Sequence, residues 1–220
     1  MNKTIYDDGA QAYLVEGATF TGKEEIPVMM DLRNTQIPRG LISFDQAVAT
    51  TDSAEYRNYV HFYIHDTKFS ALLSSTRKYL RLLQKFDGVI SPDVSLITSH
   101  SRSVQQMGTY FNRAIGFYLQ KNGIPVIPNI RWSDEKSFEF CFLGVPKYSI
   151  VAISTHGCMK RKGYKDFFKA GLNQMLDKIE PSDVIVHGHM PKDVFSDFVN
   201  RTRFHRYPSQ FELTHKRTGD

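Results

Sequence analysis

From about residue 59 onward, short apolar segments typical of strands alternate with longer segments in which apolar residues recur at helical spacing. Residues 59–65 alternate strictly, with Val60 and Phe62 on one face, as in a half-buried strand. Residues 149–154 and 183–187 are near-continuous apolar runs, the pattern of strands that are buried on both faces. Because such strands need helices on both sides, the alternation predicts an α/β fold with a largely parallel sheet and right-handed β-α-β crossovers.

The remaining elements of this core follow from the same two patterns. Helices are expected in residues 69–86, from about residue 103 to Gly123, in residues 164–179 and around residues 193–200, with further strands at 88–91 and 124–130. The beginning of the chain differs, because glycine or proline interrupts its apolar pattern six times. We therefore predict an irregular N-terminal segment of short strands packed on the core (residues 1–55), an α/β core domain (56–208) and a basic C-terminal tail (209–220).

Length and composition narrow the class of protein. A chain of 220 residues is long enough to bury a full hydrophobic core. No apolar run approaches the roughly 20 residues that span a bilayer, and the first residues lack the apolar stretch of a signal peptide. Cys141 and Cys158 form no C-x-x-C pair and are expected to be reduced, buried thiols. We expect a soluble, cytoplasmic protein with no membrane partner.

The charge balance is mildly basic. The formal net charge is +5, and the excess is concentrated in residues 201–206 and 160–162. Such an excess is compatible with a phosphate-bearing partner such as a nucleotide or nucleic acid. Basic surface segments are more often simply solvated, so the charge alone adds little to that interpretation.

The ends of the expected strands carry the candidate functional residues. In parallel α/β sheets, ligands bind beyond the carboxyl ends of the strands, where loops and helix N-termini converge. Each of five expected strands is followed there by at least one group that can ligate, donate or titrate, which indicates a polar cleft. The candidate catalytic residues are Asp66, Asp93, Asp134 and His156, and the candidate ligand-binding residues are Asn129, Arg131, Trp132, Thr155 and His187.

These candidates also have structural interpretations. Asp66 lies just before a predicted helix, where a carboxylate serves as an N-cap, and Asp93 lies in a turn-prone context where an Asx-turn competes. Trp132 stands beside Arg131, a pair that suits a stacked or anionic ligand, but a tryptophan also packs under loops. Both interpretations stay open for each residue.

Metal binding is a further alternative. His187 and His189 are two residues apart, and His156 and Asp93 would complete a set of metal ligands. No known metal motif has this arrangement, and two histidines alone do not make a site. The sequence therefore predicts neither a particular metal nor a cofactor.

Residues 17–24 almost match the phosphate-binding loop G-x-x-x-x-G-K-[ST]. Glu24 stands where a hydroxyl should meet magnesium, and its carboxylate would repel phosphate. Pro27 then interrupts the helix whose N-terminus would hold the anion. We reject this motif. The signatures of dinucleotide-binding folds, α/β-hydrolases and zinc deaminases are also missing from the sequence.

A further pattern is spread over about residues 13–205. It consists of segments 14–22, 41–44, 60–62, 88–93 and 112–116, and, most specifically, 126–132, 155–157 and 188–191. Together these segments resemble an uncharacterised family of bacteriophage and mobile-element proteins, carried as a domain of unknown function. The resemblance implies a phage or mobile-element origin and a setting in the host bacterial cytoplasm. It implies no chemistry, and its pattern does not require histidine at position 189.

Two functional hypotheses follow. In the first, the protein is an enzyme that acts on a phosphate-bearing substrate, a nucleotide or nucleic acid, with Arg131 neutralising phosphate and the carboxylates and histidines transferring protons. In the second, the same cleft holds a ligand without reaction, as in a regulatory or host-factor-binding (counter-defence) protein of the phage. The sequence leaves open whether the protein is an enzyme, and it does not predict the oligomeric state.

Overall fold

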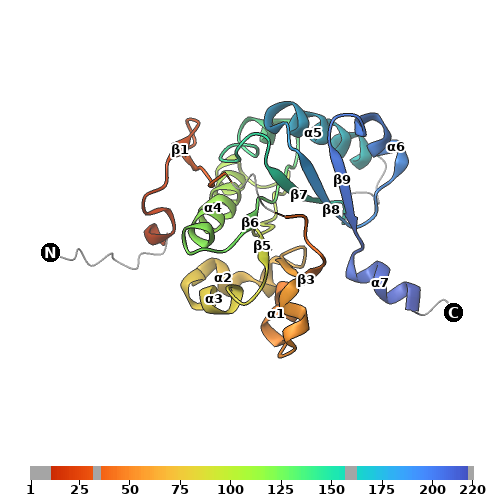
Figure 1. The fold of residues 1–220 in the computed structure, drawn as a ribbon. Helices are drawn as coiled ribbons and strands as arrows, with labels where there is room; N and C mark the ends of the chain where they lie inside the picture. Colours follow the sequence, from red (N-terminus) through yellow and green to blue (C-terminus); the bar gives the residue numbers. More distant parts are fainter. Residues whose placement is uncertain (1–10, 32–35, 157–162, 218–220) are drawn as a thin grey trace.

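The computed structural model describes residues 11–31, 36–156 and 163–217. Its main feature is a series of parallel strands that pair in the order in which they occur along the chain (Figure 1). Two hydrogen bonds, from Ile130 N to Ala152 O and from Ala152 N to Pro128 O (both 2.8 Å), join a four-stranded and a three-stranded part. The strands are β3 (Leu41–Ser43), β4 (Tyr59–His61), β5 (Gly88–Ile90), β6 (Val126–Ile127), β7 (Ile150–Ser154), β8 (Asp183–His187) and β9 (Arg203–Tyr207). The predicted α/β class with a largely parallel sheet is confirmed.

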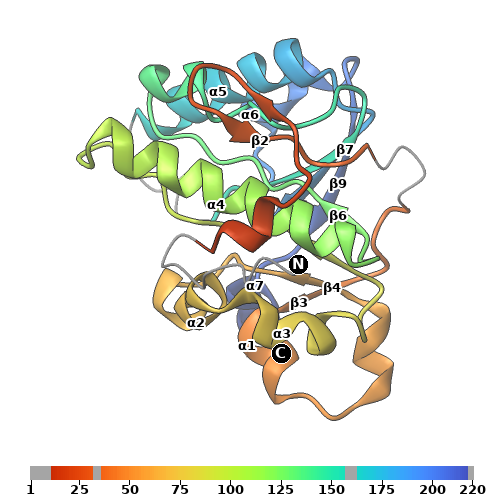
Figure 2. The same ribbon diagram turned by 90° about the vertical axis from the view of Figure 1, so that its left-hand side faces the viewer.

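Helices occupy most of the connections between these strands. The α-helices are α1 (Phe44–Ala49), α2 (Ser70–Ser74), α3 (Thr76–Leu83), α4 (Arg102–Lys121), α5 (Tyr164–Ile179), α6 (Lys192–Phe195) and α7 (Gln210–Arg217). Short 3₁₀ helices are η1 (Ala12–Val15), η2 (Ser53–Arg57), η3 (Asp66–Lys68), η4 (Glu135–Glu139) and η5 (Ser196–Phe198). Before the sheet begins, β1 (Phe20–Thr21) and β2 (Ile26–Pro27) form an antiparallel pair. In Figure 2, α4 lies between α1–α3 below and α5 and α6 above.

The sheet is curled, so that one face encloses a small apolar core. Side chains from β4 to β8 share this inner cluster, and Leu41 of β3 and Tyr207 of β9 pack against it from the two edges of the sheet. Tyr207 Oη also donates a hydrogen bond to the carbonyl oxygen of Pro38, which brings the β9 edge next to the segment leading into β3. Parallel strands in chain order with helices outside follow the plan of a βα-barrel. Within the described residues, β3 and β9 are not paired, so this barrel is open along one side.

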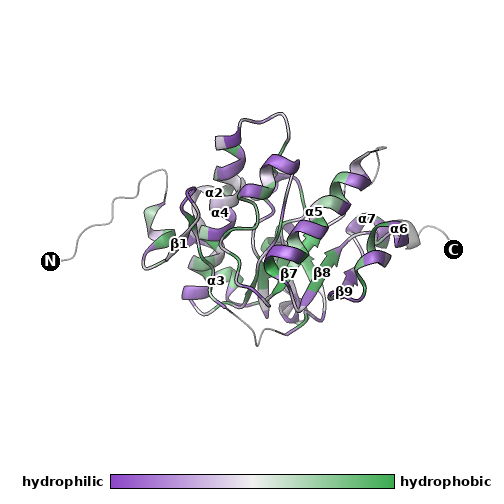
Figure 3. Ribbon diagram, turned by 90° about the horizontal axis from the view of Figure 1, so that it is seen from above, coloured by the Kyte–Doolittle hydropathy of each residue, from purple (hydrophilic) through white to green (hydrophobic). Residues whose placement is uncertain are grey.

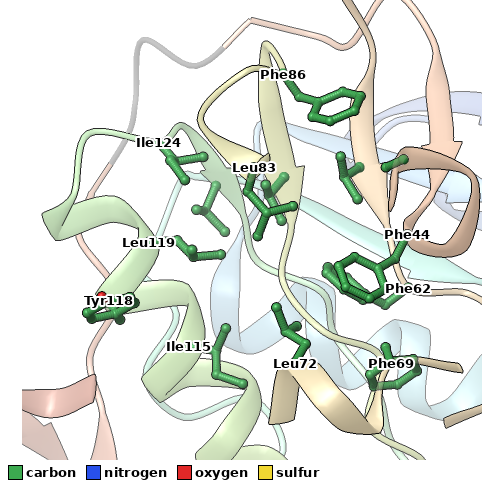
Figure 4. Packing of buried hydrophobic residues seen from close by; sticks show 14 of the residues in the cluster. Phe44, Phe62, Phe69, Leu72, Leu83, Phe86, Ile115, Tyr118, Leu119 and Ile124 are labelled. Atoms are coloured by element: carbon green, nitrogen blue, oxygen red, sulfur yellow. The ribbon is translucent and has the colours of Figure 1, made fainter. Parts of the chain in front are cut away.

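The outer face of the sheet is covered by helices in two larger clusters. Phe62, Leu83 and Leu119 belong to the first, which packs α1–α4 against the first strands (Figure 4). Leu172 and Val184 belong to the second, which packs α5 and α6 against β7 and β8. Figure 3 shows hydrophobic residues on β7 and β8 and hydrophilic residues on the outer turns of α5. This two-sided burial explains the near-continuous apolar runs of these strands.

Some elements differ from their predicted extents. The strand expected over residues 59–65 ends at His61, because the ring nitrogen Nδ1 of His61 accepts a hydrogen bond from Tyr63 N (3.2 Å) and ends the strand pairing. The helix expected over residues 69–86 is broken at Ser75, whose φ of −153° is not helical.

The N-terminal segment contains the short strands that were expected there, but it also forms a helix, and two basic segments expected to be solvated form regular elements. Residues 41–49, inside the segment predicted to be irregular, form β3 and α1. Most of the basic stretch at residues 201–206 lies in strand β9, and the C-terminal tail contains α7. Cys141 is a buried free thiol, as predicted, whereas Cys158 and the basic residues 160–162 lie outside the described residues. The proposed division of the chain near residues 55 and 208 stays a prediction.

Candidate functional site

A cavity of about 370 Å³ opens beyond the carboxyl ends of the strands. Its walls come from both edges of the curled sheet, because β3 and β4 supply one side and β8 and the start of α7 supply the other. The polar side chains that line it include His61, Tyr63, His65, Lys68, His156 and His187. We call this cavity the carboxyl-end cleft. It lies where ligands bind in barrels of parallel strands.

Three aromatic rings in mutual contact form the buried part of the carboxyl-end cleft. The ring centroids of His61 and His187 lie 4.7 Å apart, and those of Tyr63 and His187 lie 4.6 Å apart with an interplanar angle of 19°. His61 and Tyr63 reach the same face because they are two residues apart at the end of β4. All three side chains are buried, which fixes their orientation by packing.

Burial keeps the two buried imidazoles neutral at pH 7. It lowers the pKa of His61 to about 4. Burial, together with the neighbouring His61 and His156, lowers the pKa of His187 to about 2. The Nδ1 atom of His187 is 3.2 Å from Ser154 Oγ on the adjacent strand β7, so the ring is held by a hydrogen bond as well as by stacking. Burial likewise raises the pKa of Tyr63, so its hydroxyl stays protonated.

A chain of hydrogen bonds leads from these rings across the ends of β5 and β6. Tyr63 Oη donates to Asn129 Oδ1 (3.0 Å), and Asn129 Nδ2 donates to Asp93 Oδ1 (2.8 Å). The other carboxylate oxygen of Asp93 accepts from Arg131 Nη1 at 3.2 Å. Asn129 is completely buried, whereas the side chain of Arg131 is 28% exposed. The chain therefore connects the floor of the carboxyl-end cleft with a guanidinium group that solvent can reach.

A buried cation on α4 supports this hydrogen-bonded chain from below. The guanidinium of Arg113, only 1% exposed, donates from Nη1 to the carbonyl oxygen of Asn129 (2.9 Å). Its Nε donates to Leu143 O (2.9 Å) and its Nη2 to Cys141 O (2.8 Å). Burial lowers the pKa of Arg113 to about 10, which still leaves it protonated at pH 7. The backbone on which Asn129 and Arg131 stand is thus tied to α4.

The structure brings five of the nine residues predicted from the sequence together at the carboxyl-end cleft and its hydrogen-bonded chain, and places a sixth, Thr155, next to them. Asp93, Asn129 and Arg131 are joined by the hydrogen bonds described above. His156 lies at the exposed rim, with its ring centroid 6.5 Å from that of His187. Thr155 is buried, and its Oγ1 donates to the carbonyl oxygen of His189 (2.6 Å), so it fixes the loop rather than facing the cavity.

The other three predicted residues lie outside the carboxyl-end cleft and make structural contacts. Asp66 accepts hydrogen bonds from the backbone and hydroxyl of Ser95. Asp134 is the N-cap of η4. Trp132 packs against α5 so closely that a Cβ on Gly171 would lie 2.2 Å from its Nε1 atom. Their roles in function stay predictions.

Sequence reasoning did not single out His61, Tyr63, Ser154 or Arg113 as site residues. A signal existed for the first two, because the strict alternation of residues 59–65 placed both on the face opposite the apolar one. No signal existed for Arg113, since its amphipathic helix does not show which polar positions face the sheet.

The basic stretch at residues 201–206 is locally neutralised. Arg201 pairs with Asp177 at 2.7 Å, and Arg203 pairs with Asp183 at 2.8 Å. Arg206 likewise contacts Glu212. The charge excess that favoured a nucleic-acid partner is therefore partly engaged within the protein. In the described part of the chain, no three histidine, cysteine or acidic side chains are arranged to hold a metal ion.

An open barrel of parallel strands with a polar cleft at the carboxyl ends defines an α/β protein of βα-barrel plan. The chain belongs to the family described as "Domain of unknown function (DUF4417)", whose model matches residues 18–208. It is 30% identical over 197 residues to the "Gene 1 protein" of Mycobacterium phage D29, covering 89% of this chain and 71% of that protein. It is also 30% identical over 193 residues to the "Gene 1 protein" of Mycobacterium phage L5, covering 87% of this chain and 82% of that protein.

These findings confirm the resemblance to an uncharacterised phage family. No solved structure matches the chain. Among the helices in the described residues, none combines the length and apolar character that a membrane crossing requires.

Proposed function

We propose that this protein binds a phosphate-bearing ligand, a nucleotide or nucleic acid, at the polar site formed by the carboxyl-end cleft and the hydrogen-bonded chain that leads from it to Arg131. The observation that carries the proposal is the convergence of side chains from β4 to β8 on one connected polar site beside a cavity of about 370 Å³. That volume falls within the range of about 300–1,000 Å³ that is typical of small-molecule sites. A few fixed polar groups on an otherwise packed wall are also typical of such sites.

Two cations border the site, and each is balanced by a carboxylate. Lys68 Nζ is 2.7 Å from Asp45, and Arg131 Nη1 is 3.2 Å from Asp93. An incoming phosphate would compete with these carboxylates for the same donors. Such a pair keeps a cation oriented until an anion arrives, and a guanidinium can bind phosphate through two parallel hydrogen bonds.

The buried imidazoles suit a binding role better than proton transfer. A general base works best with a pKa near the working pH, whereas the pKa values of His61 and His187 are about 4 and about 2. Neutral imidazoles still offer N–H donors and stacking faces to a ligand. His156, at the exposed rim, is the candidate for proton transfer if the bound ligand is also turned over.

The test is isothermal titration calorimetry with nucleoside mono-, di- and triphosphates and a short single-stranded oligonucleotide. Arg131→Gln and Lys68→Ala should each weaken binding, by about 10- to 150-fold for the loss of one charge-assisted hydrogen bond. The matched control is Lys147→Ala, which removes a similar ion pair (2.6 Å to Glu180) before the amino end of β7. It should bind as the wild type does.

The proposal fails if the wild type binds none of these compounds, or if Arg131→Gln and Lys68→Ala both bind them as tightly as Lys147→Ala does. Chromatography of the recovered ligand then separates the two modes of action. An unchanged ligand indicates a binding protein, and a converted one indicates an enzyme that uses the same cleft.

A further inference from the structure

A second cavity, of about 180 Å³, is lined by Arg131, at the end of the hydrogen-bonded chain that is farther from the carboxyl-end cleft. It is formed by the loop after β5, the loop after β6 and the first turn of α5. Its lining is aromatic and apolar, apart from Arg131, Thr98 and Ser133. We call it the aromatic cavity, and the side chains that matter here are Ile97, Arg131, Trp132, Tyr164, Phe167 and Phe168.

Three large hydrophobic side chains at the rim of the aromatic cavity are exposed to solvent. Ile97 is 45% exposed, Tyr164 48% and Phe167 53%. Tyr164 and Phe167 are three residues apart at the start of α5, so they lie on the same side of the helix. The floor, by contrast, is packed, because the rings of Trp132 and Phe168 lie 5.1 Å apart between their centroids. Exposed rings above a rigid aromatic floor form a surface on which a planar group can stack.

Arg131 joins this aromatic surface to the proposed phosphate site. Its side chain lines the aromatic cavity and pairs with Asp93, which the hydrogen-bonded chain connects to Tyr63 in the carboxyl-end cleft. A ligand that carries an anionic group next to a planar ring would therefore place the anion at the guanidinium and the ring among the aromatic side chains. Nucleotides have this combination of groups.

We propose that the aromatic cavity is the nucleobase subsite of the phosphate-bearing ligand. This inference rests on the proposed function and assigns a binding site to the base of the ligand, in addition to the site for its phosphate. The cavity, at about 180 Å³, is smaller than the roughly 300 Å³ of a typical whole-ligand site, so it takes one ring system and not an entire nucleotide. Stacking accepts every base, and the sugar and phosphate extend toward Arg131.

The same base-and-phosphate unit occurs in a free nucleotide and in single-stranded nucleic acid. The experiment therefore uses the four ribonucleoside 5′-monophosphates, a short single-stranded oligonucleotide, and ribose 5-phosphate as the ligand without a base. Binding is measured by calorimetry for the wild type, Phe167→Ala, Phe167→Trp and Phe20→Ala. The last variant is the control, because Phe20 is a 48% exposed phenylalanine on β1, outside the aromatic cavity.

The wild type should bind the nucleotides about ten-fold or more tightly than ribose 5-phosphate, in line with the stacking of one base. Phe167→Ala should remove most of this difference, while its affinity for ribose 5-phosphate stays unchanged. Phe167→Trp should keep the difference, and Phe20→Ala should behave as the wild type does. A higher affinity for the oligonucleotide than for every monophosphate would identify single-stranded nucleic acid as the source of the base.

The inference is overturned if ribose 5-phosphate binds as tightly as the nucleotides, or if Phe167→Ala keeps the wild-type preference. In either case phosphate binding is still observed, so the proposed function survives without the base subsite. If the wild type binds neither ribose 5-phosphate nor any nucleotide or oligonucleotide, the proposed function itself is refuted and the base subsite with it.

Discussion

Replacing Arg113 by methionine tests whether this buried cation holds the site's backbone in place. Methionine is similarly long and fills much of the same space, but it has no hydrogen to donate. The carbonyl oxygens of Cys141 and Leu143, which accept from Arg113 at 2.8 and 2.9 Å, would lose that donor. An unsatisfied buried acceptor costs about 1–3 kcal/mol, so the two together cost about 2–6 kcal/mol.

A second effect opposes this loss. Burying a charged guanidinium is itself unfavourable, as the lowering of the pKa of Arg113 to about 10 indicates, and methionine removes that cost. We therefore expect a net loss near the lower end of the range, about 2–3 kcal/mol. For a chain of this length, such a loss lowers the melting temperature by about 5–10 °C.

The assay is urea unfolding followed by circular dichroism, with Arg81→Met as the matched control on the exposed surface of α3. The control should stay within about 0.5 kcal/mol of the wild type. If Arg113→Met is as stable as the control, the guanidinium does not anchor the carbonyl groups, and the account of how Asn129 is positioned is wrong.

Three further predictions concern other parts of the molecule. The pKa of His61 is lowered to about 4, so the unfolded chain takes up a proton that the folded chain refuses between pH 6.5 and pH 4. The protonation of His61 in the unfolded chain should therefore lower the free energy of unfolding by about 3 kcal/mol over this window. In urea unfolding, the stability of His61→Asn should depend less steeply on pH than that of the wild type. Equal pH dependence of the two proteins would contradict this prediction. Gly171→Ala should displace the ring of Trp132 and lower the free energy of unfolding by about 1–3 kcal/mol. Because Trp132 is the single tryptophan, its fluorescence emission should change, and an unaltered spectrum would argue against the close packing. Burial opposes the ionisation of Asp183, but hydrogen bonds from Arg203 and His205 outweigh it and lower the pKa of Asp183 to about 2. Asp183→Asn should therefore cost about 2 kcal/mol at pH 7, a difference that disappears in thermal unfolding as the pH falls from about 4 to 2.

The central strands and the longest amphipathic helix of the second half could be predicted from the sequence because their burial pattern is repeated over many residues. The helix expected at residues 164–179 has those bounds in α5, and the strand expected at 183–187 is β8. Strand β9 could not be predicted in this way. Its basic residues are typical of a solvated segment, and the partner of Arg203 is Asp183, which is 20 residues away in the sequence.

Contacts between residues far apart in the sequence also limited the prediction of the candidate site. Topology alone predicted that Asp93, Asn129 and Arg131 follow neighbouring strands, and the structure joins them by hydrogen bonds. The sequence could not show that the rings of His61 and His187 are in contact, because strands four places apart along the chain face each other only when the sheet is curled. The degree of curling depends on packing across the whole inner cluster and has no local signature.

The open side of the barrel leaves two strand edges that a closed barrel would not have. Within the described residues, β9 pairs only with β8, and β3 pairs only with β4. Unpaired backbone groups on such edges can recruit strands from other molecules, and natural proteins prevent this with short strands and charged side chains. β3 has three residues, and β9 carries Arg203 and Arg206, so both edges have this protection. The arginines that resemble a solvated tail in the sequence thus help to keep an incomplete barrel from aggregating through its edges.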